Sequence, residues 1–255
     1  MPTSIFVPNT LPKDPQLEIR RGKRAGFAAE NLQGHADGMG TSFQGMWGNS
    51  ALHDQTGLYD TPAKVKVAST DANDASGGTG TTTVLLSGYD SSNVAQSESV
   101  TMNGQTEVES SNTYKAVTGL VQIGVGSGQK NAGDLWVGVG SFTTGVPATK
   151  YLFMEVGDTL SKSAINFVST GHTHWIIQLA LTIADTGKAL QIHLMTYDGT
   201  HERRVAVFEL GAGVLTTDTD TVPEITAGVM WWMMGKVNTS TADVTTIVAY
   251  LDETL

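Results

Sequence analysis

Residues 174–195 (HWIIQLALTIADTGKALQIHLM) constrain the fold more than any other stretch of the chain. Every second residue from Trp175 to Ile183 is large and apolar. A period of two is typical of a half-buried β-strand, because successive side chains point to opposite faces. Residues 185–188 supply turn chemistry, and a second alternating run begins at Leu190. The pattern predicts a central β-hairpin whose first strand turns its odd-numbered side chains toward a large core.

Shorter strand-like runs, separated by turns rich in Gly, Asp, Ser and Thr, fill the chain after residue 60. Only 16% of residues are charged, which suits many short strands better than helices rich in Glu and Lys. Further strands are expected at residues 63–69, 81–87, 98–102, 114–125, 134–139, 151–156, 164–169, 203–210, 229–235 and 244–251. Asn103-Gly104 is typical of a two-residue hairpin turn. We predict an all-β fold, an antiparallel, jelly-roll-like β-sandwich over residues 61–255, built as one body or as two subdomains, 61–145 and 146–255.

Residues 1–60 differ from the rest and predict an extended N-terminal arm. Four prolines within the first fifteen residues oppose a regular helix and favour an extended path. A basic cluster follows, a short helix is expected around residues 25–33, and a glycine-rich tract with scattered aromatic residues comes next. Disordered segments are poor in aromatic residues. We therefore expect the arm to lie on its own body or on a neighbouring subunit, with a disordered tail as the alternative.

Charge and composition narrow the function classes. The net charge is −10, and all of the acidic excess lies after residue 66, so the body lacks the basic surface that nucleic acid requires. No apolar run is long enough for a membrane helix, and the first residues do not resemble a secretory signal. We therefore expect synthesis in a cytoplasm, with neither nucleic acid nor membrane as a partner. The absence of cysteine excludes disulfides and thiolate metal sites.

Two groups of side chains could hold a metal ion. His172 and His174 would share one face of a strand, and His193 or His201 could add a third ligand; the alternative is that they are ordinary polar residues at a strand edge. Acidic loops form the second group, but they lack the glycine and the closing glutamate of a calcium loop, so solvated loops are expected at Asp71, Asp74, Asp218, Asp220 and Glu224. We predict no metal and no cofactor.

No catalytic motif is present. The chain has no G-x-S-x-G elbow, no phosphate-binding G-x-x-x-x-G-K-[ST] loop, and no acidic pair beside aromatic residues in a strand pattern. We predict that the protein is not an enzyme.

The adjacent tryptophans in residues 229–235 (VMWWMMG) are the most unusual apolar feature. On a strand one ring faces each way, so one of them should lie off the main core face. A subunit interface formed by Trp231, Trp232 and Met233 is predicted. Plain core packing and a sugar-stacking platform are the alternatives.

A family resemblance enters through residues 65–108 and 126–135, with a looser match over 146–156 and 183–194. Their most distinctive part is the loop STDANDASGGTG followed by the turn NGQT. The chain resembles structural proteins of tailed, mainly marine, bacteriophages, and residues 1–60 carry no part of this likeness. The resemblance implies a non-enzymatic virion component.

Among virion roles we expect a capsid decoration (cement) protein, a homotrimer on the capsid surface that binds the major capsid protein. An arm with aromatic anchors suits this role, because it can cross a subunit boundary. The residues expected to contact the capsid are Arg20, Arg21, Lys23, Arg24, Phe27, Phe43 and Trp47. The alternative is a tail or fibre component that contacts host glycans, although no shaft repeat is present.

Overall fold

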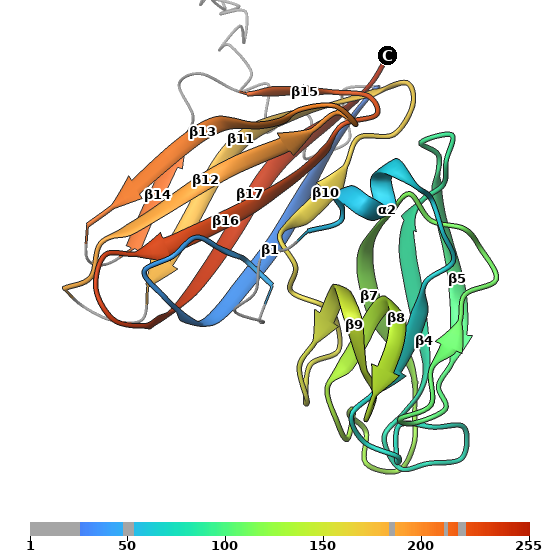
Figure 1. The fold of residues 1–255 in the computed structure, drawn as a ribbon. Helices are drawn as coiled ribbons and strands as arrows, with labels where there is room; N and C mark the ends of the chain where they lie inside the picture. The colour runs from blue at the N-terminus through green and yellow to red at the C-terminus, as the bar shows by residue number, and fades with distance from the viewer. Residues whose placement is uncertain (1–25, 48–53, 184–186, 212–213, 219–222) are drawn as a thin grey trace, which may run out of the picture.

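The computed structural model describes residues 26–47, 54–183, 187–211, 214–218 and 223–255, in which nearly all regular structure is β-strand (Figure 1). All strand pairs are antiparallel. The all-β, antiparallel prediction is therefore confirmed. The strands form four sheets grouped in two units, which we call the main unit (residues 26–47 and 164–255) and the inserted unit (residues 54–154), joined by a linker of residues 155–163.

The main unit contains two five-stranded sheets. Its strands are β1 (Phe27–Met39), β2 (Gln44–Gly45), β10 (Ile165–Phe167), β11 (His172–Ile183), β12 (Leu190–Tyr197), β13 (Glu202–Leu210), β14 (Val214–Asp218), β15 (Glu224–Thr226), β16 (Met230–Val237) and β17 (Ala242–Thr254). One sheet has the order β1-β17-β11-β14, with β15 also paired to β11, and the other has the order β10-β16-β12-β13, with β2 paired to β16. Apolar side chains of both sheets meet in one buried cluster.

The inserted unit lies between β1 and β10 in the sequence. It contains the short helix α2 (Thr56–Asp60) and the strands β3 (Lys66–Ser69), β4 (Thr81–Tyr89), β5 (Ala95–Thr101), β6 (Val108–Glu109), β7 (Ala116–Val125), β8 (Leu135–Thr143) and β9 (Val146–Met154). Its sheets have the orders β6-β3-β8-β9 and β5-β4-β7. Their shared apolar cluster also includes residues of α2 and of the main-unit strands β10 and β16.

The predicted central hairpin is wrong in its pairing. Both strands form, but β11 pairs with β14, β15 and β17, whereas β12 pairs with β13 and β16 in the other sheet. The odd-numbered face is buried in the core from Leu179 to Ile183, but Ile176 replaces Trp175 there because the register shifts between Ile176 and Gln178. Asn103-Gly104 does form a turn, yet the strands on either side pair in different sheets.

The predicted arm is also different in the structure. Residues 27–39 form β1 in register with β17, from Phe27 opposite Glu253 to Met39 opposite Ala242, so the expected helix around 25–33 is wrong and the arm does not extend to residue 60. This strand has too few apolar residues to show an alternating pattern of its own. It forms because its backbone pairs along the long strand β17. The division at 145/146 is likewise wrong, because it cuts between β8 and β9, which pair with each other.

Candidate functional site

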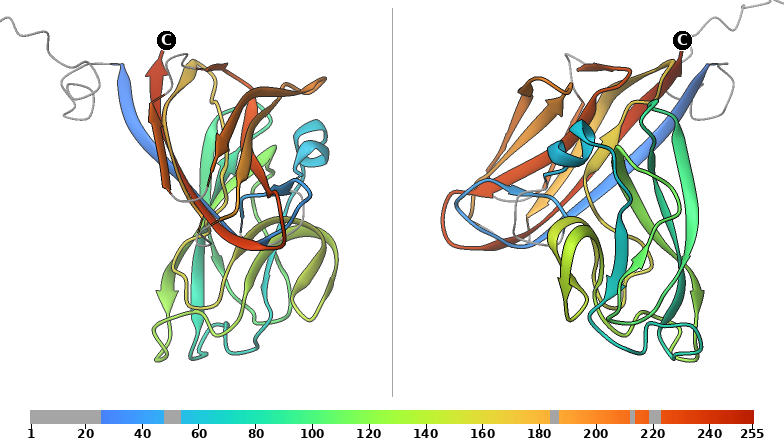
Figure 2. Two further views of the ribbon diagram at one scale, coloured as in Figure 1. Left: turned by 90° about the vertical axis from the view of Figure 1, so that its left-hand side faces the viewer. Right: turned by 45° about the vertical axis from the view of Figure 1, so that its right-hand side comes forward.

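The two units are held together at the end that carries α2 (Figure 2). The Tyr197 hydroxyl donates to Asp60 Oδ1 at 2.8 Å, and the Tyr59 hydroxyl donates to the Gly228 carbonyl. Thr170 donates from its backbone N to the Asn93 carbonyl at 2.9 Å. The ring of Phe167 on β10 packs against Tyr59 at 5.9 Å between centroids. These contacts fix the relative orientation of the units.

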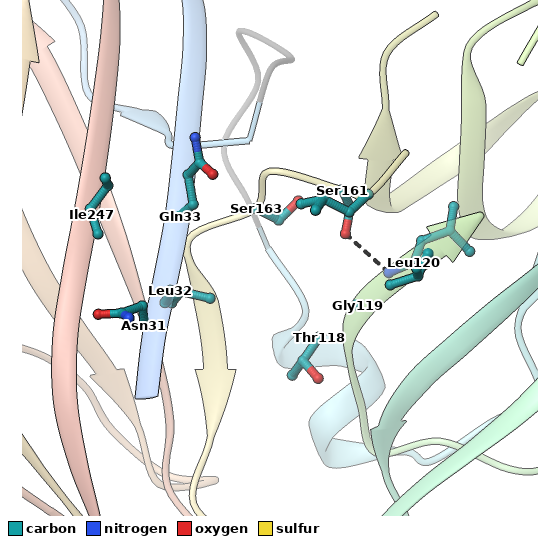
Figure 3. Close-up of a pocket in the computed structure, with 11 residues that line it drawn as sticks. Asn31, Leu32, Gln33, Thr118, Gly119, Leu120, Ser161, Ser163 and Ile247 are labelled. Carbon is teal, nitrogen blue, oxygen red and sulfur yellow. Dashed lines mark hydrogen bonds between the residues drawn. The ribbon is translucent and has the colours of Figure 1, made fainter. Parts of the chain in front are cut away.

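A groove of about 530 Å³ runs between the units on the side of β1 and β7 (Figure 3). One wall is the edge of β1 with Ile247 of β17 behind it, and the opposite wall is residues 118–121 of β7. Leu160, Ser161 and Ser163 lie between the walls. The linker is fixed to β7, since Leu120 N donates to Ser161 Oγ at 3.0 Å and Ser161 N donates to the Leu120 carbonyl at 2.8 Å.

The groove is chemically neutral. None of the described residues that line it carries a charge, and its polar groups are amides and hydroxyls such as Asn31, Gln33 and Thr118. Ser163 is 2% exposed, and its hydroxyl has no hydrogen-bond partner among the described residues. A buried hydroxyl without a partner costs free energy. This surface is therefore suited to a neutral ligand that brings its own hydrogen-bonding groups.

An exposed apolar stripe continues from the groove along β7. Val121, Ile123 and Val125 are 38%, 51% and 45% exposed, on a part of β7 whose register with β4 shifts between Gln122 and Val125. Val121 belongs to the stripe and to the groove wall. Contiguous exposed apolar side chains mark interaction surfaces more often than isolated ones do. Sequence analysis identified this segment as a strand, but alternation alone could not tell which face would be buried.

The predicted His172/His174 pair is brought together with Asp252. His172 Nδ1 lies 2.8 Å from Asp252 Oδ1, and His174 Nε2 lies 3.6 Å from the same oxygen. Trp231 Nε1 donates to His174 Nδ1 at 3.1 Å, so a neutral His174 carries its proton on Nε2. Burial lowers the pKa of His174 to about 4; the negative charge of Asp252 opposes this shift, and His172 adds to it.

The pKa of His174 predicts a pH dependence of stability. The pKa is lower in the folded chain than the ordinary value of 6.5, so the unfolded chain binds more protons between these two pH values. Stability should be full above pH 6.5 and should fall by about 2–3 kcal/mol as the pH drops toward 4. Urea unfolding at a series of pH values checks this. His174→Gln should flatten the dependence, whereas His201→Gln, at an exposed turn, should leave it unchanged.

The other predicted metal ligands do not join this pair. His193 lies on β12, with the Phe43 ring 4.0 Å away, and His201 lies beside Asp198. No set of three or more His, Asp or Glu side chains in the described part of the chain is placed to hold a metal ion. Asp220 lies outside the described residues, and only the backbone of Asp218 is described.

Asp74 corrects the prediction of a solvated acidic loop. It is 0% exposed. Its carboxylate accepts hydrogen bonds from Ser69 Oγ and Thr81 N at 2.6 Å, Ala132 N at 2.8 Å and Gly133 N at 2.9 Å. These donors join loop 70–80 to loop 126–133, which are distant in sequence. Asp74 therefore stabilises the loops at the far end of the inserted unit, and sequence polarity alone gave no sign of this.

The predicted subunit interface is wrong, because its side chains are buried inside the chain. Trp231, Trp232 and Met233 are 0%, 6% and 1% exposed. Trp231 and Met233 lie in the main-unit core, and Trp232 faces the cluster shared with the inserted unit. The expectation that one ring faces each way is confirmed. Plain core packing, the alternative, describes Trp231, and Trp232 forms part of the junction between units.

The predicted capsid-contact residues divide into two groups. Arg20, Arg21, Lys23 and Arg24 lie outside the described residues. Trp47 is 1% exposed and packs edge-on against Trp136 of the inserted unit, with 6.2 Å between ring centroids. Phe43 packs on His193, and Phe27 begins β1. Trp47 is therefore buried in its own chain and has no surface to offer to a capsid.

No family model matches this chain, and no curated protein matches it. Among solved structures, the chain has a weak likeness to the VP2 subviral particle of infectious bursal disease virus. Sequence identity is 8% and the TM-score is 0.16, over 90% of this chain and 77% of that chain. A likeness at this level carries no argument about the fold. None of the described helices is long and apolar enough to cross a membrane.

Proposed function

We propose that this chain is a non-enzymatic structural protein of a tailed-phage virion, a decoration protein that binds the assembled major capsid lattice as a homotrimer. A protein that binds only the assembled shell stabilises that shell by mass action. The capsid surface is the proposed location. We further propose that the main unit is a jelly-roll sandwich. The strand order of this unit is the observation that carries the proposal.

Eight main-unit strands, taken in chain order without β2 and β15, support the jelly-roll proposal. Numbered 1 to 8 along the chain, neighbouring strands follow the order 1-8-3-6 in one sheet and 2-7-4-5 in the other. A jelly roll, in which two Greek keys wind into two facing sheets, would have this order, and the agreement supports the proposal. Jelly rolls are common in viral capsid and lectin domains. Because one fold hosts many functions, the order supports the proposal without replacing a test.

The capsid contact is proposed to involve the basic cluster that precedes β1. Deleting residues 1–60 would also remove β1 and β2, so the test replaces Arg20, Arg21, Lys23 and Arg24 by Gln in the full-length chain. We expect particle occupancy to fall about tenfold, because several charge contacts per trimer act together. Quantification of the chain in purified particles measures this. Unchanged occupancy would rule out the cluster as a capsid contact.

Copy number tests the location. A decoration protein should be present on the order of hundreds of copies per particle, in step with the symmetric shell. A few copies at one vertex would instead support the second candidate, a tail component that contacts host glycans. The lectin use of jelly rolls favours that candidate. The burial of Trp231 and Trp232 removes its expected sugar platform.

A further inference from the structure

We infer that the groove between the units binds residues 2–12 of the same chain, as an added strand on the free edge of β1. This inference does not rest on the proposed function. Residues 2–12 would fill the neutral groove and pair with the open sheet edge that forms one of its walls.

The free edge of β1 provides the hydrogen-bonding surface. Among the described strands, β1 lies at the edge of its sheet and has β17 as its one partner. His35 N donates to the Lys162 carbonyl, on the side away from β17. Alternate residues of a strand direct their backbone groups to the same edge, so Asn31 and Gln33 present theirs to the groove. An extended segment can pair with such an edge through its own backbone.

The chemistry of residues 2–12 (PTSIFVPNTLP) fits the groove. This segment is uncharged, whereas charged residues begin at Lys13. A charged segment would lose hydration against a lining without ions, but Ile5, Phe6 and Val7 would bury apolar surface there. The flanking prolines favour an extended path.

The length of the chain favours its own segment over a second copy. Asn31 and Gln33 lie five and seven residues beyond Gly26, about 17–23 Å along β1. Residue 12 lies fourteen positions before Gly26, and an extended chain of that length can span about 46 Å, enough to turn and run back beside the strand. Gly26 has φ +82°, a conformation that suits a change of direction. A short tether gives an effective concentration of about millimolar, which a free second copy seldom reaches.

The charges near the start of β1 also favour a chain that turns back there from residue 12 to Gly26. The basic cluster would lie in the connection between the bound segment and β1. At that end of β1, Glu253 lies opposite Phe27 and Asp252 lies opposite Ala28. These carboxylates are on the neighbouring strand and would attract the basic connection.

Cross-linking in the full-length chain tests the inference, because the chain has no native cysteine. Thr3→Cys with Thr118→Cys places one thiol on the segment and one in the groove. Thr3→Cys with Thr200→Cys is the matched control, on the turn between β12 and β13. With a short bismaleimide we expect about tenfold more single-chain product from the first pair than from the control. Cross-linked dimers would show a second copy in the groove, and equal yields would show an empty groove; either result overturns the inference.

Hydrogen exchange at Gln33 gives a second test without cysteines. In Phe6→Asp the buried charge should release the segment, and the Gln33 amide should exchange about tenfold faster than in the parent chain. Gln16→Asp makes the same charge change outside residues 2–12 and should leave this rate unchanged. Equal exchange of Gln33 in the parent and in Phe6→Asp would overturn the inference.

Discussion

Replacing Asp74 by alanine should unfold the inserted unit, with a loss of about 4 kcal/mol or more in its free energy of unfolding. The substitution removes the acceptor of four hydrogen bonds and leaves three backbone N–H groups, of Thr81, Ala132 and Gly133, without it. Each buried donor that loses its partner costs about 1–3 kcal/mol. Hydrogen exchange should therefore accelerate in β3 and β4 while the main-unit strands stay protected.

Asp71→Ala is the matched control for this prediction. Asp71 accepts from Asn73 N at 2.8 Å, but the contact is exposed, so the loss should be below about 1 kcal/mol. Gly80, which lies against the Asp74 carboxylate, offers a second test of the same role. A Cβ at Gly80 would lie 2.1 Å from Asp74 Oδ1, so Gly80→Ala should also destabilise the unit. An Asp74→Ala protein as stable as Asp71→Ala would refute the proposed role of the carboxylate.

Trp231→Ala should lower the free energy of unfolding of the main unit by about 3–5 kcal/mol. Trp231 is fully buried in the main core, where its ring packs edge-on against Tyr250 at 5.6 Å between centroids. Its removal leaves a cavity and takes away the donor to His174 Nδ1. Urea unfolding measures the loss.

Two variants separate the contributions of Trp231. Trp231→Phe retains much of the volume but not the donor, so it should cost about 1–2 kcal/mol. Trp175→Ala removes a half-buried ring whose Nε1 donates a hydrogen bond to Glu253. It should lower the free energy of unfolding by less than Trp231→Ala does. A Trp231→Ala loss no larger than that of Trp175→Ala would mean that the ring does not support the core.

The sequence predicted the strands well because local alternation determines them. The runs at 81–87, 203–210 and 244–251 lie within β4, β13 and β17, each of which is longer. It could not predict which strands pair, because alternation identifies a face but not a neighbour. For this reason the two strands of the expected hairpin lie in different sheets. β1 was not predicted as a strand, because it has few apolar residues.

The candidate site was less predictable for a related reason. The groove combines β1, β7, β17 and the linker, which only the tertiary structure brings together. The tryptophan pair showed its two-sided orientation in the sequence, but its burial depends on an inserted unit that covers the outer side of β16. Asp74 looked solvated because its bonding partners lie up to 59 residues away.

The pairing of β1 with β17 has a consequence for the order in which the chain folds during synthesis. The first strand of the main unit leaves the ribosome early, yet its neighbour ends at Thr254, whose N–H donates to the Gly26 carbonyl at 2.7 Å. All strands of the inserted unit have emerged at residue 154, and only the β10 and β16 residues of its apolar cluster follow later. We expect it to fold first, while β1 waits for the last strand to arrive. Contacts so distant in sequence slow folding, so closure of the main unit should be the slow step of biogenesis.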